Sequence, residues 1–351
     1  MIDPAATEYL HGASPITALV KQQPEDFVVI EDFEPEPESA GEHQWLWVEK
    51  RGANTHFVIE CLAKFAKVRP QDVGYAGLKD RHAVTRQWFS IQLPGQALLD
   101  WQQLEHPEFT VLQVRQQSRK LKTGSHKGNW FQIRLREVSD VAALQARWQA
   151  VVTTGVPNYF GLQRFGRNGR NLQQVQAWFS GRIRKPKRNE QSIWLSSARS
   201  YLFNQIVSER ISQHGQTLLA GDVMQLAGSN SYFVAPSLDA ELHARVATGD
   251  IMATAALWGA GELPATGVVA ELERQVAARY PEFTEGLLKH GLQQQRRRLW
   301  LRPEQPQLKL DEQDPASVWL HFYLTKGSFA TSVLRELVSQ GQSSHDEDTI
   351  E

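Results

Sequence analysis

The sequence predicts an α+β protein whose strands pair mostly antiparallel. Several segments between residues 27 and 135 alternate apolar and polar side chains, as strands with one buried face do. Because these strands follow one another with few helices between them, antiparallel pairing is favoured. A length of 351 residues, with 41% hydrophobic and 22% charged residues, indicates a soluble globular chain of about two domains.

The first part of the chain alternates strands with two helices. After an irregular lead-in over residues 1–20, strands are expected at 27–30, 44–49, 89–93, 109–114 and 131–135. The first helix starts at Asn54 or Thr55, since both residues can cap a helix, and ends before Pro70. The second starts at Ser139 and closes at Gly155.

A change of composition near Gly155 marks a domain boundary. Residues 155–190 are rich in Gly, Asn and Arg. Beyond them we expect helices at about 171–180, 196–213, 239–247 and 268–279, short strands near Val223 and Tyr232, and extended chain at 297–302.

The last segment returns to the earlier pattern. A strand at 318–324 leads through Lys326 and Gly327 to an amphipathic helix with Ser328 at its start. A helix N-terminus beside a lysine can bind a phosphate, and a simple strand-to-helix turn is the alternative.

Charge is distributed unevenly along the chain, although the formal net charge is only −1. Residues 115–136 hold seven Lys or Arg and no acid, and further basic clusters lie at 182–188 and 296–298. Local potential attracts a polyanion, so this pattern favours RNA or DNA binding over a merely solvated face.

Other features narrow the class of protein. The single cysteine, Cys61, cannot form an internal disulfide, and it lies in a helical apolar pattern that favours a small buried side chain. The histidines show no ligand spacing, so we expect no metal. With no signal peptide and no apolar run of about 18 residues, we expect no membrane span and a cytoplasmic protein.

The segment whose residues are best suited to catalysis is 74–87, Gly-Tyr-Ala-Gly-Leu-Lys-Asp-Arg-His-Ala-Val-Thr-Arg-Gln. Its carboxylate, Asp80, has Lys79, Arg81 and Arg86 nearby in sequence, and these cations favour the ionised form. An ionised, fixed carboxylate can act as a nucleophile or base. Taken alone, the same residues favour an Asp–Arg ion pair in a tight surface loop over a catalytic group.

Four segments together resemble the TruD family of pseudouridine synthases. They are 74–87, Lys-Gln-Gln-Pro-Glu-Asp-Phe-Val-Val at 21–29, Asn-Tyr-Phe-Gly-Leu-Gln-Arg-Phe-Gly at 158–166 and Lys-Gly-Ser-Phe at 326–329. The resemblance implies an α+β catalytic domain with a mixed, largely antiparallel sheet, interrupted by a family-specific α/β domain. The catalytic domain would then comprise residues 1–154 and 304–351, and the insert residues 155–303.

The resemblance also implies the reaction and its substrate. The family cleaves the N-glycosidic bond of a uridine, rotates the uracil and rejoins it through carbon, with no cofactor or metal. The implied target is position thirteen in the D arm of tRNA, typically glutamate tRNA. Asp80 matches the family's indispensable aspartate, which attacks the sugar, attacks the base or removes a sugar proton.

Further residues match family positions near the substrate. Phe131 would lie against the target base, although its alternation with Ile133 and Leu135 also fits core packing. Asn129 could hydrogen-bond the uracil edge, and Phe27 and Phe329 would lie nearby.

The cations have two expected roles. Lys21 is the candidate partner of Asp80, with Lys79 or Arg81 as alternatives. The residues expected to meet the RNA backbone are Lys79, Arg81, Arg182, Arg184, Lys185 and Lys187.

Two other functions remain possible on the residues alone. A non-catalytic RNA-binding protein would use the same basic clusters without needing Asp80. A hydrolase would need a second carboxylate near Asp80, such as Asp72.

Overall fold

The protein is built around one large, mixed sheet. The computed structural model describes residues 2–36, 38, 40–184, 186–235 and 237–340. The strand order is β14-β15-β7-β2-β5-β3-β6; in addition, β1 pairs with β7 and β16, and β4 pairs with β5. Along this order the β2–β5 pair is parallel and the other neighbours are antiparallel. The predicted α+β class with a largely antiparallel sheet is therefore confirmed.

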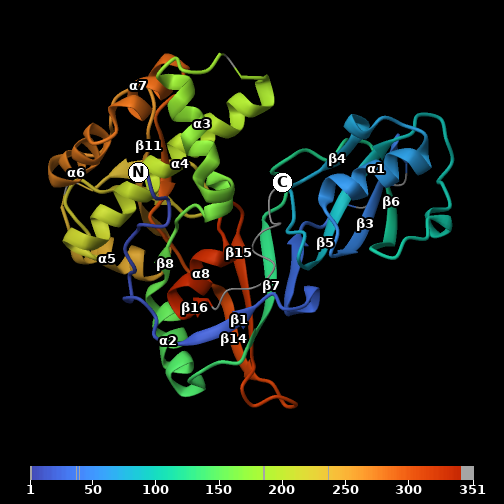
Figure 1. Cartoon of the computed structure of the whole chain (residues 1–351), viewed down its shortest axis with the longest axis horizontal. Helices are drawn as coiled ribbons and strands as arrows, with labels where there is room; N and C mark the ends of the chain where they lie inside the picture. The colour runs from blue at the N-terminus through green and yellow to red at the C-terminus, as the bar shows by residue number, and fades with distance from the viewer. Residues whose placement is uncertain (1, 37, 39, 185, 236, 341–351) are drawn as a thin grey trace.

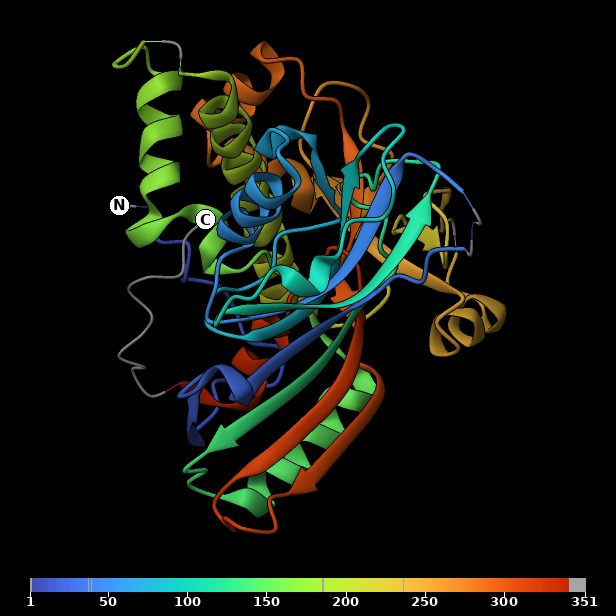
Figure 2. The ribbon, with the colours of Figure 1, turned by 90° about the vertical axis from the view of Figure 1, so that its right-hand side faces the viewer.

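The strands of this sheet come from both ends of the chain. They are β1 (Thr17–Val20), β2 (Phe27–Asp32), β3 (His43–Arg51), β4 (Val73–Tyr75), β5 (Val84–Gln92), β6 (Phe109–Gln117), β7 (Gly128–Arg136), β14 (Glu304–Leu310), β15 (Val318–Thr325) and β16 (Ser339–Gln340). β15 pairs with β7 along its whole length, from Val318 opposite Leu135 to Thr325 opposite Gly128. Figure 2 shows β14 and β15 beside β7, with α2 (Val141–Thr154) packed against them.

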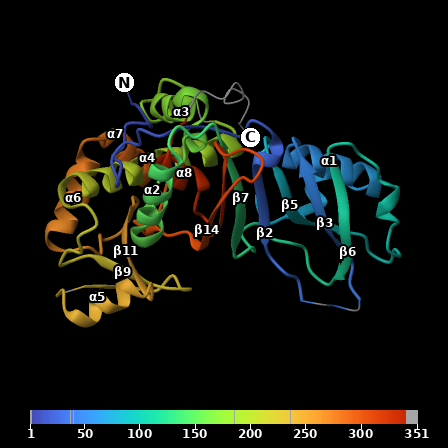
Figure 3. The ribbon, with the colours of Figure 1, turned by 90° about the horizontal axis from the view of Figure 1, so that it is seen from below.

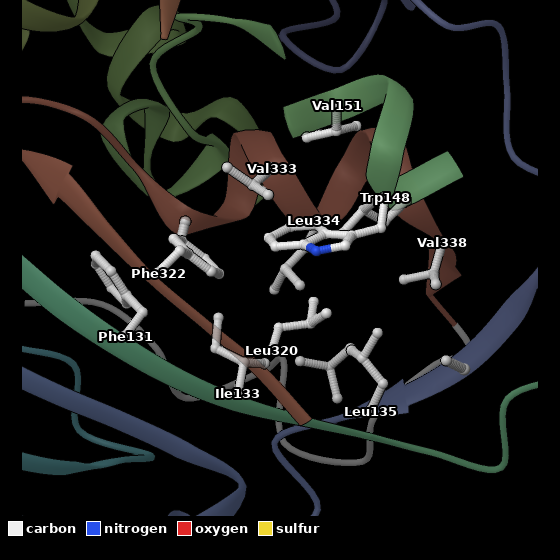
Figure 4. Packing of buried hydrophobic residues seen from close by; sticks show 14 of the residues in the cluster. Phe131, Ile133, Leu135, Trp148, Val151, Leu320, Phe322, Val333, Leu334 and Val338 are labelled. Atoms are coloured by element: carbon white, nitrogen blue, oxygen red, sulfur yellow. The ribbon is translucent and has the colours of Figure 1, made fainter. Parts of the chain in front are cut away.

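Three helices cover one face of the sheet in two separate apolar clusters. Helices α2 and α8 (Ala330–Leu337) pack on β7 and β15, where Trp148, Leu320 and Leu334 are fully or almost fully buried (Figure 4). Helix α1 (Thr55–Ala66) packs on β3 and β5 at the other end of the sheet (Figure 1). This spacing leaves the middle of the sheet for other groups.

Residues 155–303, the segment expected to form the insert, build hydrophobic clusters of their own. The helices of this segment are α3 (Arg170–Phe179), α4 (Arg188–His214), α5 (Ala240–Ala247), α6 (Gly267–Ala278) and α7 (Pro281–Lys289). Helices α4, α5 and α6 pack on an antiparallel sheet of order β10-β9-β11-β12, formed by Tyr232–Val234, Val223–Leu226, Ile251–Leu257 and Gln295–Arg298, whereas α3 and α7 pack on α4. In Figures 1 and 3 this unit lies at the opposite end of the molecule from α1.

The chain enters and leaves the insert at one point. Strand β8 (Val156–Pro157) pairs antiparallel with β13 (Trp300–Leu301). The loop that follows β15 also contacts this junction, because Gly327 accepts a hydrogen bond from Arg297 at the end of the insert. The segment 155–303 therefore adjoins the loop that follows β15.

Several elements differ from the sequence prediction. Strand β1 lies within the segment expected to be irregular, and the short run Thr17–Val20 is held there by β7 and β16. Helix α4 starts at Arg188, and β11, α7 and β14 were not predicted. Asp140, one residue beyond Ser139, caps α2 by accepting from the Ala143 amide.

No helix in the described ranges is long and apolar enough to cross a membrane.

Candidate active site

The two apolar clusters are separated by a polar strip on the same face of the sheet. Thr85 on β5 lies directly opposite Val29 of β2 and Lys50 of β3, and paired residues share a face. Lys50, Thr85 and Gln87 are all buried. Buried polar side chains between two hydrophobic clusters mark this strip as a candidate site rather than as core.

The loop that carries Asp80 is anchored to this strip through its backbone. Lys50 donates from Nζ to the carbonyl oxygen of Asp80 at 2.6 Å, and Gln87 donates from Nε2 to that of Gly77 at 2.9 Å. At the start of α1, Thr55 accepts from the Lys79 amide at 3.1 Å. The backbone around Asp80 is thus fixed from three elements.

The Asp80 carboxylate is partly exposed, and Lys21 is its ion-pair partner among the described residues. Lys21 Nζ lies 3.7 Å from Asp80 Oδ2, and the two side chains are 20% and 39% exposed. The same ammonium sits 4.0 Å from the centre of the Phe27 ring. Lys21 has a φ of 58°, an uncommon conformation for a residue with a side chain. The structure therefore brings together Asp80 and the cation that the sequence favoured.

Lys79 is placed differently from the prediction. Its Nζ lies 2.9 Å from Glu31 Oε2, and the side chains are 5% and 0% exposed. The other oxygen of Glu31 accepts from the Trp88 amide. Contrary to the sequence prediction, Lys79 is not placed to meet RNA phosphate.

The other two cations close to Asp80 in sequence, Arg86 and Arg81, are not its ion-pair partners among the described residues. Arg86 pairs with Glu49 at 2.6 Å. Arg81 is exposed and lines a hollow of about 260 Å³ with Asn54 and Glu108. Asp72, the second carboxylate that a hydrolase would need, pairs with Arg69 in a surface turn.

Phe27 and Phe131 belong to the core beneath the site. Phe27 is 1% exposed and Phe131 7%. Their rings meet edge to face at 6.1 Å, and Phe131 stacks on Phe322 at 5.5 Å (Figure 4). The core packing left open for Phe131 is thus present. Because Lys21 covers the Phe27 ring, Phe27 supports the cation and is not placed to touch a base itself.

Asn129 presents an acceptor that nothing satisfies in the described part of the chain. It lies opposite Glu31 on β2 and Leu324 on β15, on the same face as Phe131. Its Oδ1 is buried without a partner, as are Thr85 Oγ1 and Gln87 Oε1. A buried acceptor without a donor costs about 1–3 kcal/mol, so these atoms fit a ligand that brings N–H or O–H groups.

His126, in the loop between β6 and β7, lies close to the loop that carries Asp80. A Cβ on Gly77 would lie 3.3 Å from His126 Cε1, so the absence of a side chain at Gly77 permits this close approach. Burial, and then the charge of Lys79, lower the pKa of His126. The imidazole is therefore neutral at pH 7.

The other predicted residues lie further along the chain. Phe329 is half-buried at the N-cap of α8, the position expected for Ser328, and its ring lies 6.1 Å from that of Phe160. Arg182, Arg184 and Lys187 are exposed between α3 and α4, whereas Lys185 lies outside the described residues.

Sequence reasoning missed four residues that shape the site: Glu31, Lys50, Gln87 and His126. Alternation along β2 places Glu31 on the face of Phe27 and Val29, so a charged residue in a core-facing position was an available signal. Within the described ranges, no group of three His, Cys, Asp or Glu side chains could hold a metal ion.

Comparison with known proteins gives a consistent result. The profile of the family described as tRNA pseudouridine synthase D (TruD) matches residues 5–179 and 170–337. A tRNA pseudouridine synthase D from Aeromonas salmonicida is 48% identical over 338 residues, which cover 96% of this chain and 95% of the relative. One from Idiomarina loihiensis is 44% identical and covers 94% of each chain.

A solved structure supports the fold. The TruD protein of Methanosarcina mazei superposes with a TM-score of 0.67 at 22% identity, covering 96% of both chains.

The fold and the matches define a pseudouridine synthase, an isomerase that modifies RNA. More specifically, the chain belongs to the tRNA pseudouridine synthase D (TruD) family, whose substrate is tRNA.

Proposed function

We propose that this enzyme converts uridine 13 in the D arm of glutamate tRNA to pseudouridine, with Asp80 as nucleophile or base. The observation that carries the proposal is the accessible Asp80 carboxylate, which is held beside Lys21 at the edge of a buried polar strip. A carboxylate fixed in this way can act as a nucleophile or base on ribose or uracil.

The reaction is an internal exchange of bonds. The bond from C1′ to N1 breaks, the uracil turns, and C1′ bonds to C5, while C5 loses a proton and N1 gains one. Since atoms balance within the nucleotide, the proposal requires no cofactor. Asp80 stabilises or captures the electron-poor fragment, and Lys21 keeps the carboxylate in place.

Neighbouring residues would hold the base during the turn. The N3–H of uracil is a donor that suits the orphan acceptor of Asn129. Phe131 would form the apolar floor, and Phe329 would lie at the margin of the site. A base stacked on an aromatic ring contributes roughly 1–3 kcal/mol.

The tRNA would span both parts of the chain. We propose the division into residues 1–154 and 304–351 for the catalytic domain and 155–303 for the insert, supported by the β7–β15 and β8–β13 pairings.

In the same proposal, the reaction takes place in the cytoplasm. The residues proposed to contact backbone phosphates are Arg81, Arg182, Arg184, Lys185 and Lys187.

The test compares wild type with Asp80→Asn on unmodified glutamate tRNA. Pseudouridine is mapped by carbodiimide labelling, and the RNA is checked for cleavage. We expect the wild type to modify position 13 without cleavage, and Asp80→Asn to bind tRNA without forming pseudouridine. A tRNA with cytidine at position 13 should stay unlabelled there. Pseudouridine formation by Asp80→Asn, or shortened RNA, would contradict the proposal.

A further inference from the structure

Two arginines that pair with no carboxylate of the described residues lie where the insert meets the final segment of the chain. Arg297 belongs to β12, and Arg164 lies in the short 3-10 helix Leu162–Phe165. In the part of the chain that the structure describes, the charged group acting on Arg297 is Arg164, another cation. Its sequence neighbour Arg296, in contrast, pairs with Glu273 at 2.8 Å.

Arg297 is held by neutral groups. Its Nη2 donates to the side-chain oxygen of Asn158 at 2.7 Å and to the carbonyl oxygen of Gly327 at 2.8 Å. Its guanidinium lies 4.0 Å from the centre of the Phe160 ring. Burial, and then Arg164, lower the pKa of Arg297 to about 9. A positive charge in this setting lacks a counter-charge, which an anionic ligand would supply.

Arg164 shares this environment. Its guanidinium also lies near the Phe160 ring, at 5.5 Å, and it donates to Ser196 Oγ at 3.1 Å. Burial lowers its pKa as well. Two like charges on one aromatic ring therefore remain uncompensated by any carboxylate of the described residues.

This cationic pair adjoins the proposed active site. Gly327 follows β15, whose last residues, Leu324 and Thr325, pair with Asn129 and Gly128. The intervening Lys326 is exposed, and its amide donates to the Lys127 carbonyl oxygen at 2.9 Å. Its Nζ donates to the Gly124 carbonyl oxygen at 3.2 Å, a bond that a phosphate would share or replace. The charge of Lys326 also acts on His126, which packs against Gly77 in the Asp80 loop.

The second terminal nitrogen of Arg297 remains available. Nη1 makes no hydrogen bond to the described residues, and it lies 3.7 Å from the position that a Cβ on Gly327 would occupy. Gly327 has a φ of 82°, so a side chain is disfavoured there on conformational grounds as well. The approach to Nη1 is therefore not covered by residue 327.

We propose that Arg297, Arg164 and Lys326 bind one phosphodiester of the tRNA backbone beside the nucleotide held at Asn129 and Asp80. A guanidinium meets phosphate through parallel N–H donors, and Lys326 adds a point charge. This inference rests on the proposed function and adds to it a fixed phosphate contact at the junction of insert and sheet, separate from the exposed loop at Arg182 and Arg184.

The test measures tRNA binding in full-length protein that carries Asp80→Asn, so that turnover does not intervene. Arg297→Gln and Lys326→Gln are compared by titrating unmodified glutamate tRNA between 50 and 200 mM salt. We expect each variant to bind roughly tenfold or more weakly, and to reduce the slope of log K against log salt by about 1. The matched control is Arg274→Gln on α6, an exposed arginine away from the junction, which should leave both quantities unchanged.

Two further measurements locate the contact. Ethylation of single tRNA phosphates should block binding of the parent protein at one or two positions next to nucleotide 13, and Arg297→Gln should lose this interference. Because both cations meet the same phosphate, the double variant should lose less affinity than the sum of the single losses.

A purely structural role gives a different result. Arg297 would then tie the insert to Gly327, so that Arg297→Gln lowers the melting temperature while the salt slope and the interference pattern stay as in the parent. That result would overturn the proposal. If Arg297→Gln does not fold, Lys326→Gln and Arg164→Gln serve as the test instead. An unchanged salt slope in both of these variants would overturn the proposed phosphate contact.

Failure of this inference and failure of the proposed function are separate observations. The binding measurements do not depend on pseudouridine formation, whereas the proposed function fails when wild type leaves position 13 unmodified.

Discussion

The ammonium of Lys79 lies 2.9 Å from the carboxylate of Glu31, and both side chains are buried next to the loop that carries Asp80. This pair joins the residue before Asp80 to strand β2, which begins at Phe27 beneath Lys21. The Lys79–Glu31 pair therefore ties the loop that carries Asp80 to strand β2, whose first residue, Phe27, contacts Lys21.

Breaking the buried pair should destabilise the protein strongly. Glu31→Gln leaves the Lys79 ammonium buried without a carboxylate, and we expect a loss of about 3–5 kcal/mol in the free energy of unfolding. Lys79→Met should cost a similar amount, and the double variant less than the sum. Urea unfolding of the four proteins gives the coupling. The exposed Arg69–Asp72 pair is the control, and Arg69→Gln should leave the urea unfolding curve nearly unchanged.

Lys21 should matter more for activity than for stability. Its contact with Asp80 is partly exposed, and such pairs contribute about 0–1 kcal/mol to folding. In a site that substrate closes, the same charge acts in a lower dielectric, so we expect Lys21→Met to slow pseudouridine formation by about tenfold or more. Single-turnover rates and urea unfolding check the two parts. Equal rates for wild type and Lys21→Met would remove Lys21 from the mechanism.

Asn129→Ala should reduce activity without loss of stability. The Oδ1 atom has no partner in the described structure, so its removal leaves no group newly unpaired. We expect a change in unfolding free energy within about 1 kcal/mol, and a fall in kcat/KM of roughly ten- to a hundredfold.

The matched control for Asn129 is Asn204→Ala. The Asn204 side chain bonds both the amide and the carbonyl oxygen of Phe160, at 2.9 Å each. Its loss should therefore destabilise the insert. A destabilisation by Asn129→Ala as large as that by Asn204→Ala would show that Asn129 has a structural role.

His126 should make stability depend on pH. Its pKa is lowered in the folded protein, so the unfolded chain binds a proton more readily. Stability is then full above the ordinary histidine pKa of about 6.5 and falls as pH drops below it. The charged groups facing the imidazole are Lys79, Glu31 and Lys326.

The measurement compares urea unfolding of wild type and His126→Gln at pH 5.5 and 7.5. We expect a smaller loss on acidification in the variant. The remaining pH dependence comes partly from His43 and His321, whose pKa values burial also lowers. The exposed His56, replaced by Gln, provides the control. An identical loss in wild type and His126→Gln would contradict the assignment.

The sequence predicted the fold class, because most strands alternate and most helices carry caps or apolar stripes. It missed β14 because this strand is a largely exposed edge without a buried face. It missed β1 because four residues held by distant partners carry little local pattern.

The site was predictable in part for the same reason. The four family motifs pointed to Asp80 and Lys21. Proximity in sequence misled the interpretation of Lys79, since its partner Glu31 is 48 residues away. The Lys21 ammonium covers the Phe27 ring, and no local sequence pattern predicts this contact.

The pairing of β7 with β15 has a consequence for synthesis of the protein on the ribosome. One edge of β7 can bind β2 early, whereas the other edge waits until the whole insert and β14 have been made. At ordinary elongation rates of roughly 5–20 residues per second, this delay lasts roughly tens of seconds. An unpaired strand edge can bind the wrong partner in that time. The insert, whose helices and sheet are contiguous in sequence, can fold first, so the nascent chain needs protection at β7 rather than at the insert.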